Sequence, residues 1–161
     1  MKRTLALCAL LAAADQAVKA LIRTHPVGSV IFSAPPFFEI THRTNTGAAF
    51  SLLAGSPLAV TALSLVLLLA LCAAAFRFLR PTRPARAAIA CVLGGGVGNL
   101  ADRLLFGEVT DYIRVLPLRF PVFNLADMCI TGGVAVLILL TLTGRLEKPE
   151  IQEKPANGEE A

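Results

Sequence analysis

Four apolar segments, each close to the length that a bilayer-spanning helix needs, constrain the fold of this chain more than any other feature. They cover about residues 4–22, 57–79, 86–106 and 124–143. A helix rises about 1.5 Å per residue, so about 20 residues cross the hydrocarbon core. The chain is 55% hydrophobic and only 16% charged, which lies outside the range of soluble domains. We therefore expect an all-α integral membrane protein with four transmembrane helices.

The basic residues lie between these segments and predict the orientation of the chain. One side would hold Lys2, Arg3, Arg77, Arg80, Arg83, Arg86, Arg145 and Lys148, and the other side Arg23, Arg43, Arg114 and Arg119. Because Lys and Arg are enriched on the cytoplasmic side, both termini are predicted to be cytoplasmic. The outer side then holds a longer connection, about 23–56, and a shorter one, about 107–123. The basic residues form no stripe with interleaved aromatics, so no nucleic-acid partner is expected.

The longer outer connection contains "PPFFEITHRTNTGAAF" (35–50), which alternates between apolar or ring-bearing and polar residues over 38–43. This alternation predicts a small extracytoplasmic β-sheet at the membrane–water boundary. The tail, 146–161, is charged and contains Pro, so we expect it to be a disordered cytoplasmic segment. Residues 1–145 are predicted to form one membrane domain.

The first segment also has features of a cleavable export signal. Lys2 and Arg3 precede an apolar run, "LAAADQ" (11–16) offers a small-residue cleavage site, and "LALC" (5–8) weakly resembles an acylation site. The apolar stretch resumes beyond Asp15 with "AVKALI" (17–22), so we favour a retained helix. The four cysteines lie singly within the apolar runs and are predicted to be small buried side chains.

All four aspartates of the chain, Asp15, Asp102, Asp111 and Asp127, lie in or beside the apolar segments. A charge in hydrocarbon costs about 2.5 to 3.5 kcal/mol even on lenient insertion scales, so each carboxylate needs a compensating interaction. Antiparallel threading of the helices brings all four to one depth near the outer face. Asp111 is placed in the short outer loop, and Asp127 about one turn into the last helix.

Polar companions of the aspartates follow helical spacing, so each pair shares a helix face. The pairs are Asp15–Lys19, Asn99–Asp102 and Asn124–Asp127. Hydrogen bonding between helices explains such pairs without any chemistry, and Arg103 beside Asp102 is equally explained by a structural ion pair. Both structural and functional interpretations stay open for these residues.

Asp111 and Asp127 are harder to explain structurally, because two carboxylates without an evident cation between them disfavour folding. Two neighbouring carboxylates do not both ionise readily, so one tends to hold a proton. Peptide hydrolysis needs such a base and acid pair. Asn124 is predicted to be the N-cap of the last helix, which places Asp127 at the third helical position and favours its charge. His25 and His42 are far apart on an outer loop, and we expect no metal site.

The glycine-rich stretch "GGGVGNLADR" (94–103) lacks the Lys-Ser/Thr and the preceding strand of a phosphate loop. Gly94 and Gly98 are instead spaced as small residues that let membrane helices approach closely. In "NTGAAF" (45–50), Asn45 and Gly47 suit a turn, and Phe50 leads toward the second helix. A structural turn and recognition of a peptide backbone both fit this segment.

Five motifs together resemble the bacterial signal peptidase II family of intramembrane aspartic proteases. They are "DQAVK" (15–19), "NTGAAF" (45–50), "GGGVGNLADR" (94–103), "VTDY" (109–112) and "FNLAD" (123–127). The resemblance implies that Asp111 and Asp127 are the catalytic pair. It implies that Asn45, Gly47, Asn99, Arg103 and Asn124 line or order the site, with Asp15, Lys19 and Asp102 in support. Tyr112 departs from the family, which more often has Phe there, and the stretch between the two aspartates is short.

The resemblance also implies the reaction and its place. The family removes the signal peptide from diacylglyceryl-modified prolipoproteins, cutting just before the lipidated cysteine, in the bacterial cytoplasmic (inner) membrane. On this basis we expect a multi-pass protein that acts as a monomer without a cofactor, with its active site near the outer face. Its partners would be diacylated prolipoproteins and the lipid bilayer.

Two other classes fit parts of the sequence. Intramembrane charges also mark ion or proton paths in transporters, but the inner half of the segments, such as "VAVLILLTLT" (134–143), is apolar and offers no relay. A membrane chaperone or assembly factor would need no carboxylate pair.

Overall fold

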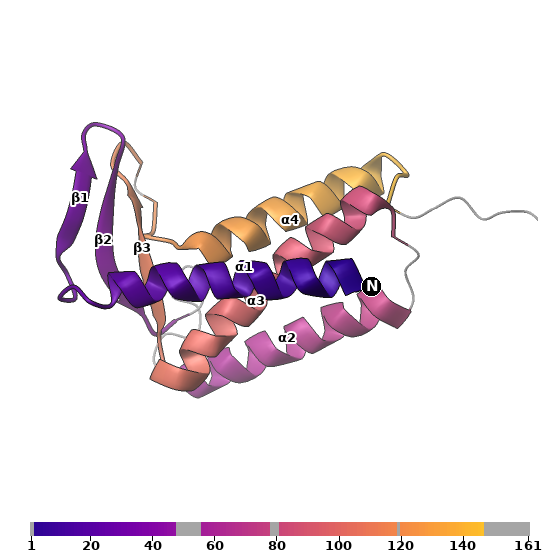
Figure 1. Cartoon of the computed structure of the whole chain (residues 1–161), viewed down its shortest axis with the longest axis horizontal. Helices are drawn as coiled ribbons and strands as arrows, with labels where there is room; N and C mark the ends of the chain where they lie inside the picture. Colours follow the sequence, from indigo (N-terminus) through magenta and orange to yellow (C-terminus); the bar gives the residue numbers. More distant parts are fainter. Residues whose placement is uncertain (1, 48–55, 78–80, 119, 147–161) are drawn as a thin grey trace, which may run out of the picture.

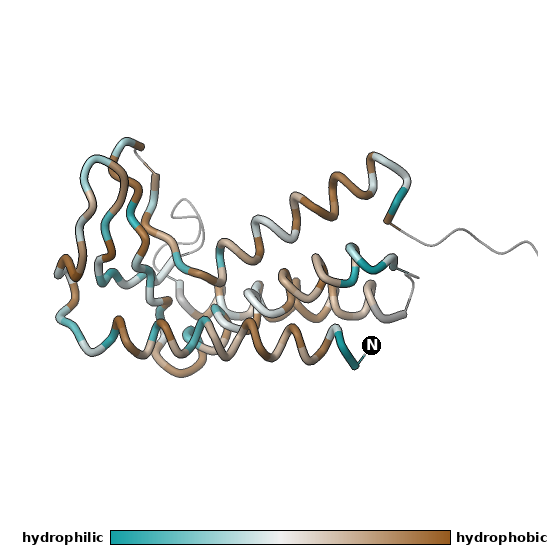
Figure 2. Tube along the Cα trace, turned by 45° about the horizontal axis from the view of Figure 1, so that its top comes forward, coloured by the Kyte–Doolittle hydropathy of each residue, from teal (hydrophilic) through white to brown (hydrophobic). Residues whose placement is uncertain are grey.

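The computed structural model describes residues 2–47, 56–77, 81–118 and 120–146, and contains four long helices and a small sheet (Figure 1). The helices are α1 (Lys2–Ile22), α2 (Pro57–Arg77), α3 (Arg83–Phe106) and α4 (Leu125–Leu142). All four are long and apolar enough to cross a membrane, as predicted. In Figure 2 the hydrophilic residues gather at the two ends of the helices and apolar residues line their lengths.

The exact ends of the helices are set by capping residues and prolines, which hydropathy alone does not locate. α3 begins at Arg83, three residues before its predicted start, because Pro84 lies in the first turn, where no backbone donor is lost. It ends at Phe106 and is capped by Gly107, whose φ of 76° is the left-handed conformation that favours glycine. α4 is preceded by its N-cap, Asn124, as predicted.

α3 is the central helix, and α1, α2 and α4 all pack against it. Its glycines allow these close approaches. A methyl group added at Gly98 would lie 2.5 Å from the Asp15 carboxylate on α1, and one added at Gly94 would lie 2.9 Å from the Cys8 carbonyl oxygen. The predicted packing role of both glycines is confirmed.

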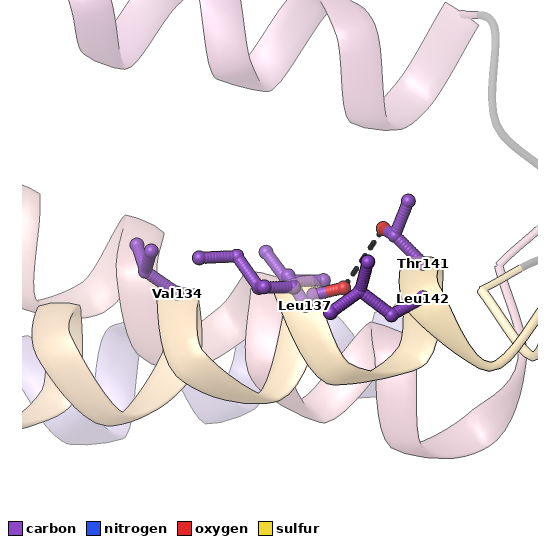
Figure 3. A pocket seen from close by; sticks show the side chains of 5 residues that line it. Val134, Leu137, Thr141 and Leu142 are labelled. Atoms are coloured by element: carbon purple, nitrogen blue, oxygen red, sulfur yellow. Dashed lines mark hydrogen bonds between the residues drawn. The ribbon is translucent and has the colours of Figure 1, made fainter.

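The helices expose apolar surface outward, as expected for lipid contact. Ala75, Ile89 and Leu93 form a small buried cluster between α2 and α3. The side of α4 near its C-terminal end carries an open apolar groove, shown in Figure 3, where the Thr141 hydroxyl donates to the Leu137 carbonyl at 2.9 Å. Its lining residues, all on α4, are Val134, Leu137, Ile138, Thr141 and Leu142.

The sheet lies across the ends of the helices, beside the C-terminal end of α1 and the N-terminal end of α4 (Figure 1). Its antiparallel strands are β1 (Val30–Ala34), β2 (Phe38–Asn45) and β3 (Val109–Val115), in the order β1-β2-β3. The prediction that Asp111 lies in a loop was wrong, since it lies within β3. This strand depends on pairing with β2, which is distant in the sequence.

The strand register gives the sheet two different faces. Phe32, Ile40 and Ile113 lie side by side, as do Ala34, Phe38 and Val115, so one face is apolar. Ser33, Glu39 and Arg114 form the opposite, polar face. Phe32 is 54% exposed, so the described part of the chain leaves much of the apolar face uncovered.

Two detailed expectations were wrong. The alternation predicted over 38–43 is interrupted by a bulge between Ile40 and Arg43, so that Thr41 and His42 are both buried. His42 is therefore not exposed, and its Nδ1 lies 2.7 Å from the His25 carbonyl oxygen. The cysteines are only partly buried within the protein, although Cys8 and Cys72 pack against the buried cluster between α2 and α3. The predicted tail beyond residue 146, and Phe50, lie outside the described residues.

Candidate active site

Asp111 occupies the middle of β3, opposite Arg43 of β2. Both of its carboxylate oxygens accept hydrogen bonds, Oδ2 from Asn45 Nδ2 at 3.0 Å and Oδ1 from Asn124 Nδ2 at 2.7 Å. The residue is only 3% exposed. Burial and, to a lesser extent, the charge of Asp127 raise the pKa of Asp111 to about 6, against the lowering effect of its hydrogen bonds.

Asp127 lies in the first turn of α4 and is held there by a reciprocal capping box. The Asn124 side chain accepts from the Asp127 backbone N–H at 2.9 Å, and Asp127 Oδ2 accepts from the Asn124 backbone N–H at 3.1 Å. The N-cap at Asn124 and the third helical position of Asp127 were predicted from the sequence, and the structure adds the reciprocal bond. The carboxylate lies where the helix dipole favours negative charge. Asp127 remains half-buried.

Asn124 joins the two carboxylates. The residue is fully buried, and it donates from its side chain to Asp111 and from its backbone to Asp127. Asn99 completes the arrangement, because its Nδ2 donates to Asp127 Oδ1 at 2.8 Å and its Oδ1 accepts from Asn124 at 3.1 Å. Asp111 and Asp127 thus come together around two asparagines.

Lys19 fixes the direction of the hydrogen bonds that Asn99 makes. Its fully buried Nζ contacts Asp15 Oδ2 at 2.8 Å, Asp102 Oδ2 at 3.2 Å and Asn99 Oδ1 at 2.8 Å. An ammonium group can only donate, so the Asn99 oxygen must face Lys19 and its amide nitrogen is left to face Asp127. Asp15 Oδ1 also accepts from the Ala126 backbone N–H in α4 at 3.0 Å.

Asp102 ties the sheet to the helices. Besides Lys19, it accepts from the Thr110 backbone N–H at 3.0 Å, from Gln16 Nε2 at 2.9 Å and from Arg23 Nη1 at 3.2 Å. Gln16, Arg23 and Thr110 were not predicted as site residues from the sequence. A signal was available for two of them, because Gln16 and Arg23 lie three residues before and four residues after Lys19, which is helical spacing.

Arg103 does not form the ion pair with Asp102 that the sequence suggested. Among the described residues, Asp102 pairs with Lys19 and Arg23 instead. The half-buried Arg103 donates to the Asn99 carbonyl oxygen at 3.4 Å and interacts electrostatically with Asp127 and Asp111. Its guanidinium has no other hydrogen-bond partner in the described part of the chain, so donors beside the carboxylate pair are left for another group.

Asn45 and Gly47 form the predicted turn at the end of β2, where the Gly47 N–H donates to Asn45 Oδ1 at 3.0 Å. This bond directs the Asn45 amide nitrogen toward Asp111. Tyr112, the departure noted in the sequence, is buried, and its hydroxyl accepts from the Leu125 backbone N–H at 3.1 Å. Burial raises the pKa of Tyr112 to about 12, so the hydroxyl stays neutral and stabilises the start of α4.

All residues singled out from the sequence as site residues thus meet at the sheet end of the helices. The fold and site define a class, a four-helix membrane protein with a paired-carboxylate centre between its sheet and its helix ends. Comparison with known proteins gives the family: the family model described as signal peptidase (SPase) II matches residues 7–143. The chain belongs to the signal peptidase II family and is a peptidase.

Individual relatives agree over most of the chain. A protein of Moorella thermoacetica named lipoprotein signal peptidase is 46% identical over 140 residues, which cover 83% of this chain and 88% of the relative. One of the same name from Dehalococcoides mccartyi is 42% identical over 134 residues, covering 81% and 82%. A solved structure described as a bacterial membrane enzyme superposes with a TM-score of 0.82 at 29% identity, covering 93% of this chain and 95% of the other.

Proposed function

We propose that this protein is a lipoprotein signal peptidase that works as an intramembrane aspartic endopeptidase. It removes the signal peptide from diacylglyceryl-modified prolipoproteins by cutting before the lipidated cysteine. The observation that carries this proposal is the meeting of Asp111 and Asp127 on Asn124. The substrate class is supported by the relatives, which are named lipoprotein signal peptidases.

The two carboxyl groups take opposite roles in the proposed reaction. Asp127 takes a proton from a water molecule, whose oxygen attacks the scissile carbonyl carbon. Asp111 gives its proton to the carbonyl oxygen, so the tetrahedral intermediate carries no net charge at that oxygen. When the C–N bond breaks, Asp127 returns its proton to the amine and Asp111 recovers its own. A pKa of about 6 for Asp111 suits the acid, because the group holds its proton closer to neutral pH than an exposed carboxyl does.

The neighbouring polar groups orient this pair and hold the substrate. Asn45, Asn99 and Asn124 donate to the carboxylates and limit their rotation. Within the part of the chain that the structure describes, Arg103 donates only to the Asn99 carbonyl, and we assign its remaining donors to a carbonyl oxygen of the substrate main chain. Asp15, Lys19 and Asp102 hold the helices and β3 in the positions that bring these side chains together. This chemistry uses no metal and no cofactor, so chelators should leave turnover unchanged.

We place the site at the outer face of the bacterial cytoplasmic membrane, with both termini in the cytoplasm. Basic residues at the end opposite the sheet support this orientation. The apolar sheet face would rest on the outer leaflet, and the signal helix would enter laterally between the transmembrane helices.

The chain has no Trp, which allows a clean test of the sheet placement. Phe32→Trp puts a single fluorophore on the apolar face, and Ser33→Trp puts one on the polar face. In vesicles of brominated phosphatidylcholine, fluorescence at position 32 should be quenched by lipid, and fluorescence at position 33 by aqueous iodide. Equal quenching of the two variants by lipid would contradict the placement.

A transporter is disfavoured by the distribution of polar residues. The site residues gather at the sheet end, and the groove near the other end of α4 is apolar (Figure 3). Within the described helices, α4 carries no charged residue beyond Asp127, so it provides no relay across the bilayer. Monomeric action is part of the proposal, since all its catalytic groups come from one chain.

Cleavage by the purified protein tests the function directly. A diacylated precursor and its unacylated form should be incubated with wild type, Asp111→Asn, Asp127→Asn and the control Glu39→Gln, which removes a carboxylate from the polar sheet face. We expect wild type and the control to cut the diacylated precursor selectively, and both aspartate variants to lose at least about 1,000-fold in rate. Normal turnover by either aspartate variant would refute the assignment of Asp111 and Asp127 as the catalytic pair. Equal cleavage of both precursors would show that the enzyme does not recognise the lipid.

A further inference from the structure

Arg23 is a charged residue outside the proposed catalytic machinery that reaches three separate elements. It follows the last residue of α1, and its backbone N–H still donates to the Lys19 carbonyl at 2.9 Å. Its Nη1 atom contacts Asp102 Oδ1 on α3 at 3.2 Å and donates to Thr110 Oγ1 on β3 at 3.1 Å. Its guanidinium also lies 4.5 Å from the ring centroid of Phe106, a cation–π contact that limits its movement.

Thr110 immediately precedes Asp111, and every polar group of this residue has a partner. Its N–H donates to Asp102, its hydroxyl accepts from Arg23, and its carbonyl accepts from Asn124 Nδ2 at 3.4 Å. The residue is 4% exposed, so water cannot readily replace a lost partner. The backbone position of Asp111 therefore depends on three hydrogen bonds of the preceding residue, Thr110. Arg23 forms the one to the Thr110 hydroxyl.

We propose that Arg23 is a positioning residue that acts through the Thr110 hydroxyl to hold Asp111 in line with Asp127. The inference rests on the proposed function, in which Asp111 is the acid. Arg23 touches neither carboxylate of the pair and is 22% exposed, so its charge is partly screened and its contribution is geometric. A displacement of a catalytic group by about 1 Å can lower the rate about 100-fold. Loss of the single hydrogen bond between Arg23 and Thr110, next to Asp111, is therefore expected to affect turnover.

The test compares Arg23→Gln, Arg23→Lys, Thr110→Val, the Arg23→Gln/Thr110→Val double variant and the control Arg114→Gln. Arg114 lies on the same strand, is 49% exposed and, within the described ranges, forms its ion pair with Glu39 alone. Each protein is assayed for kcat and KM with a diacylated precursor in detergent micelles. Amide hydrogen exchange over residues 109–115 is measured in parallel, because it reports on β3 without any need for activity.

For Arg23→Gln we expect a fall in kcat of about tenfold to 100-fold, little change in KM and faster exchange at 110–112. Thr110→Val should give a smaller fall of the same kind. Because both changes break the same bond, the double variant should be no slower than Arg23→Gln within about twofold. Arg23→Lys keeps the charge but loses the planar contact with Phe106, so it should recover only part of kcat. Arg114→Gln should match wild type in both measurements.

Three outcomes would overturn the inference: an unchanged kcat in Arg23→Gln, independent multiplication of the two single effects, or unchanged exchange over 109–115. If Arg23→Gln does not fold, Arg23→Lys and Thr110→Val decide by the same criteria. A failure of the proposed function can be told apart from a failure of this inference. If the proposed function is wrong, Asp111→Asn retains turnover, and hydrogen exchange in β3 still shows whether Arg23 holds Thr110 in place.

Discussion

Replacing Asp111 by Asn should change how the stability of the protein depends on pH. Burial, aided by the charge of Asp127, raises the pKa of Asp111 from 3.8 to about 6. Each tenfold change in proton affinity corresponds to about 1.4 kcal/mol, so the folded state binds this proton about 3 kcal/mol more tightly than the unfolded chain. An asparagine does not titrate here and lacks this contribution.

The sign follows from the raised pKa. Below about pH 4 both folded and unfolded chains hold the proton, and the stabilisation is fully present. It is lost as the pH rises to about 6, where the folded protein must ionise a buried carboxyl, and it does not change further above that value. Between pH 4 and pH 7 wild type should therefore lose about 2 to 3 kcal/mol relative to Asp111→Asn.

Thermal unfolding of both purified proteins in one detergent, from pH 4 to pH 8, measures this difference. At about 2 to 4 °C per kcal/mol for a chain of this size, the midpoint of the variant should rise by about 4 to 12 °C relative to wild type over that interval. Asparagine also changes the hydrogen bonds with Asn45 and Asn124, but this offset is independent of pH and cancels in the slope. A difference that is flat, or that grows toward acid pH, would refute the reasoning.

Two further substitutions test packing and local support. Gly98→Ala places a methyl group 2.5 Å from the Asp15 carboxylate and should destabilise the protein by about 1 to 3 kcal/mol, whereas Gly132→Ala, with open space around it, should be neutral or slightly stabilising; equal melting temperatures for the two would contradict the packing argument. Tyr112→Phe removes the acceptor for the Leu125 N–H and should cost about 1 kcal/mol while turnover stays within a fewfold of wild type. Complete inactivation of that variant would mean that the hydroxyl takes part in the chemistry.

Much of this architecture was predictable because hydrocarbon imposes strict rules. Apolar length located all four helices, and the polar residues within them had to find one another, so their helical spacing and depth were enough to predict that they meet. The Asn124 cap was predictable because it is a local interaction, formed between residues three apart in the sequence.

The parts that sequence analysis missed depend on long-range pairing. Residues 109–115 are rich in β-branched side chains, but a strand forms there only because β2 lies beside it. The bulge between Ile40 and Arg43 was missed for the same reason, because it is a feature of the pairing of β2 with β3. Arg23 was counted only as a charge on the outer side. Its helical spacing from Lys19 was a signal, but its partners Asp102 and Thr110 are distant in the sequence.

The ion pair within α1 has a consequence for how the protein is made. Lys19 lies one turn after its first acidic partner, Asp15, at a distance of 2.8 Å. During synthesis from the N-terminus, the first helix can enter the bilayer with these two charges already neutralising each other. Asp102 is synthesised later, with α3, when Lys19 of α1 is already in place to pair with it. The order of translation thus spares this acidic residue from crossing into lipid alone.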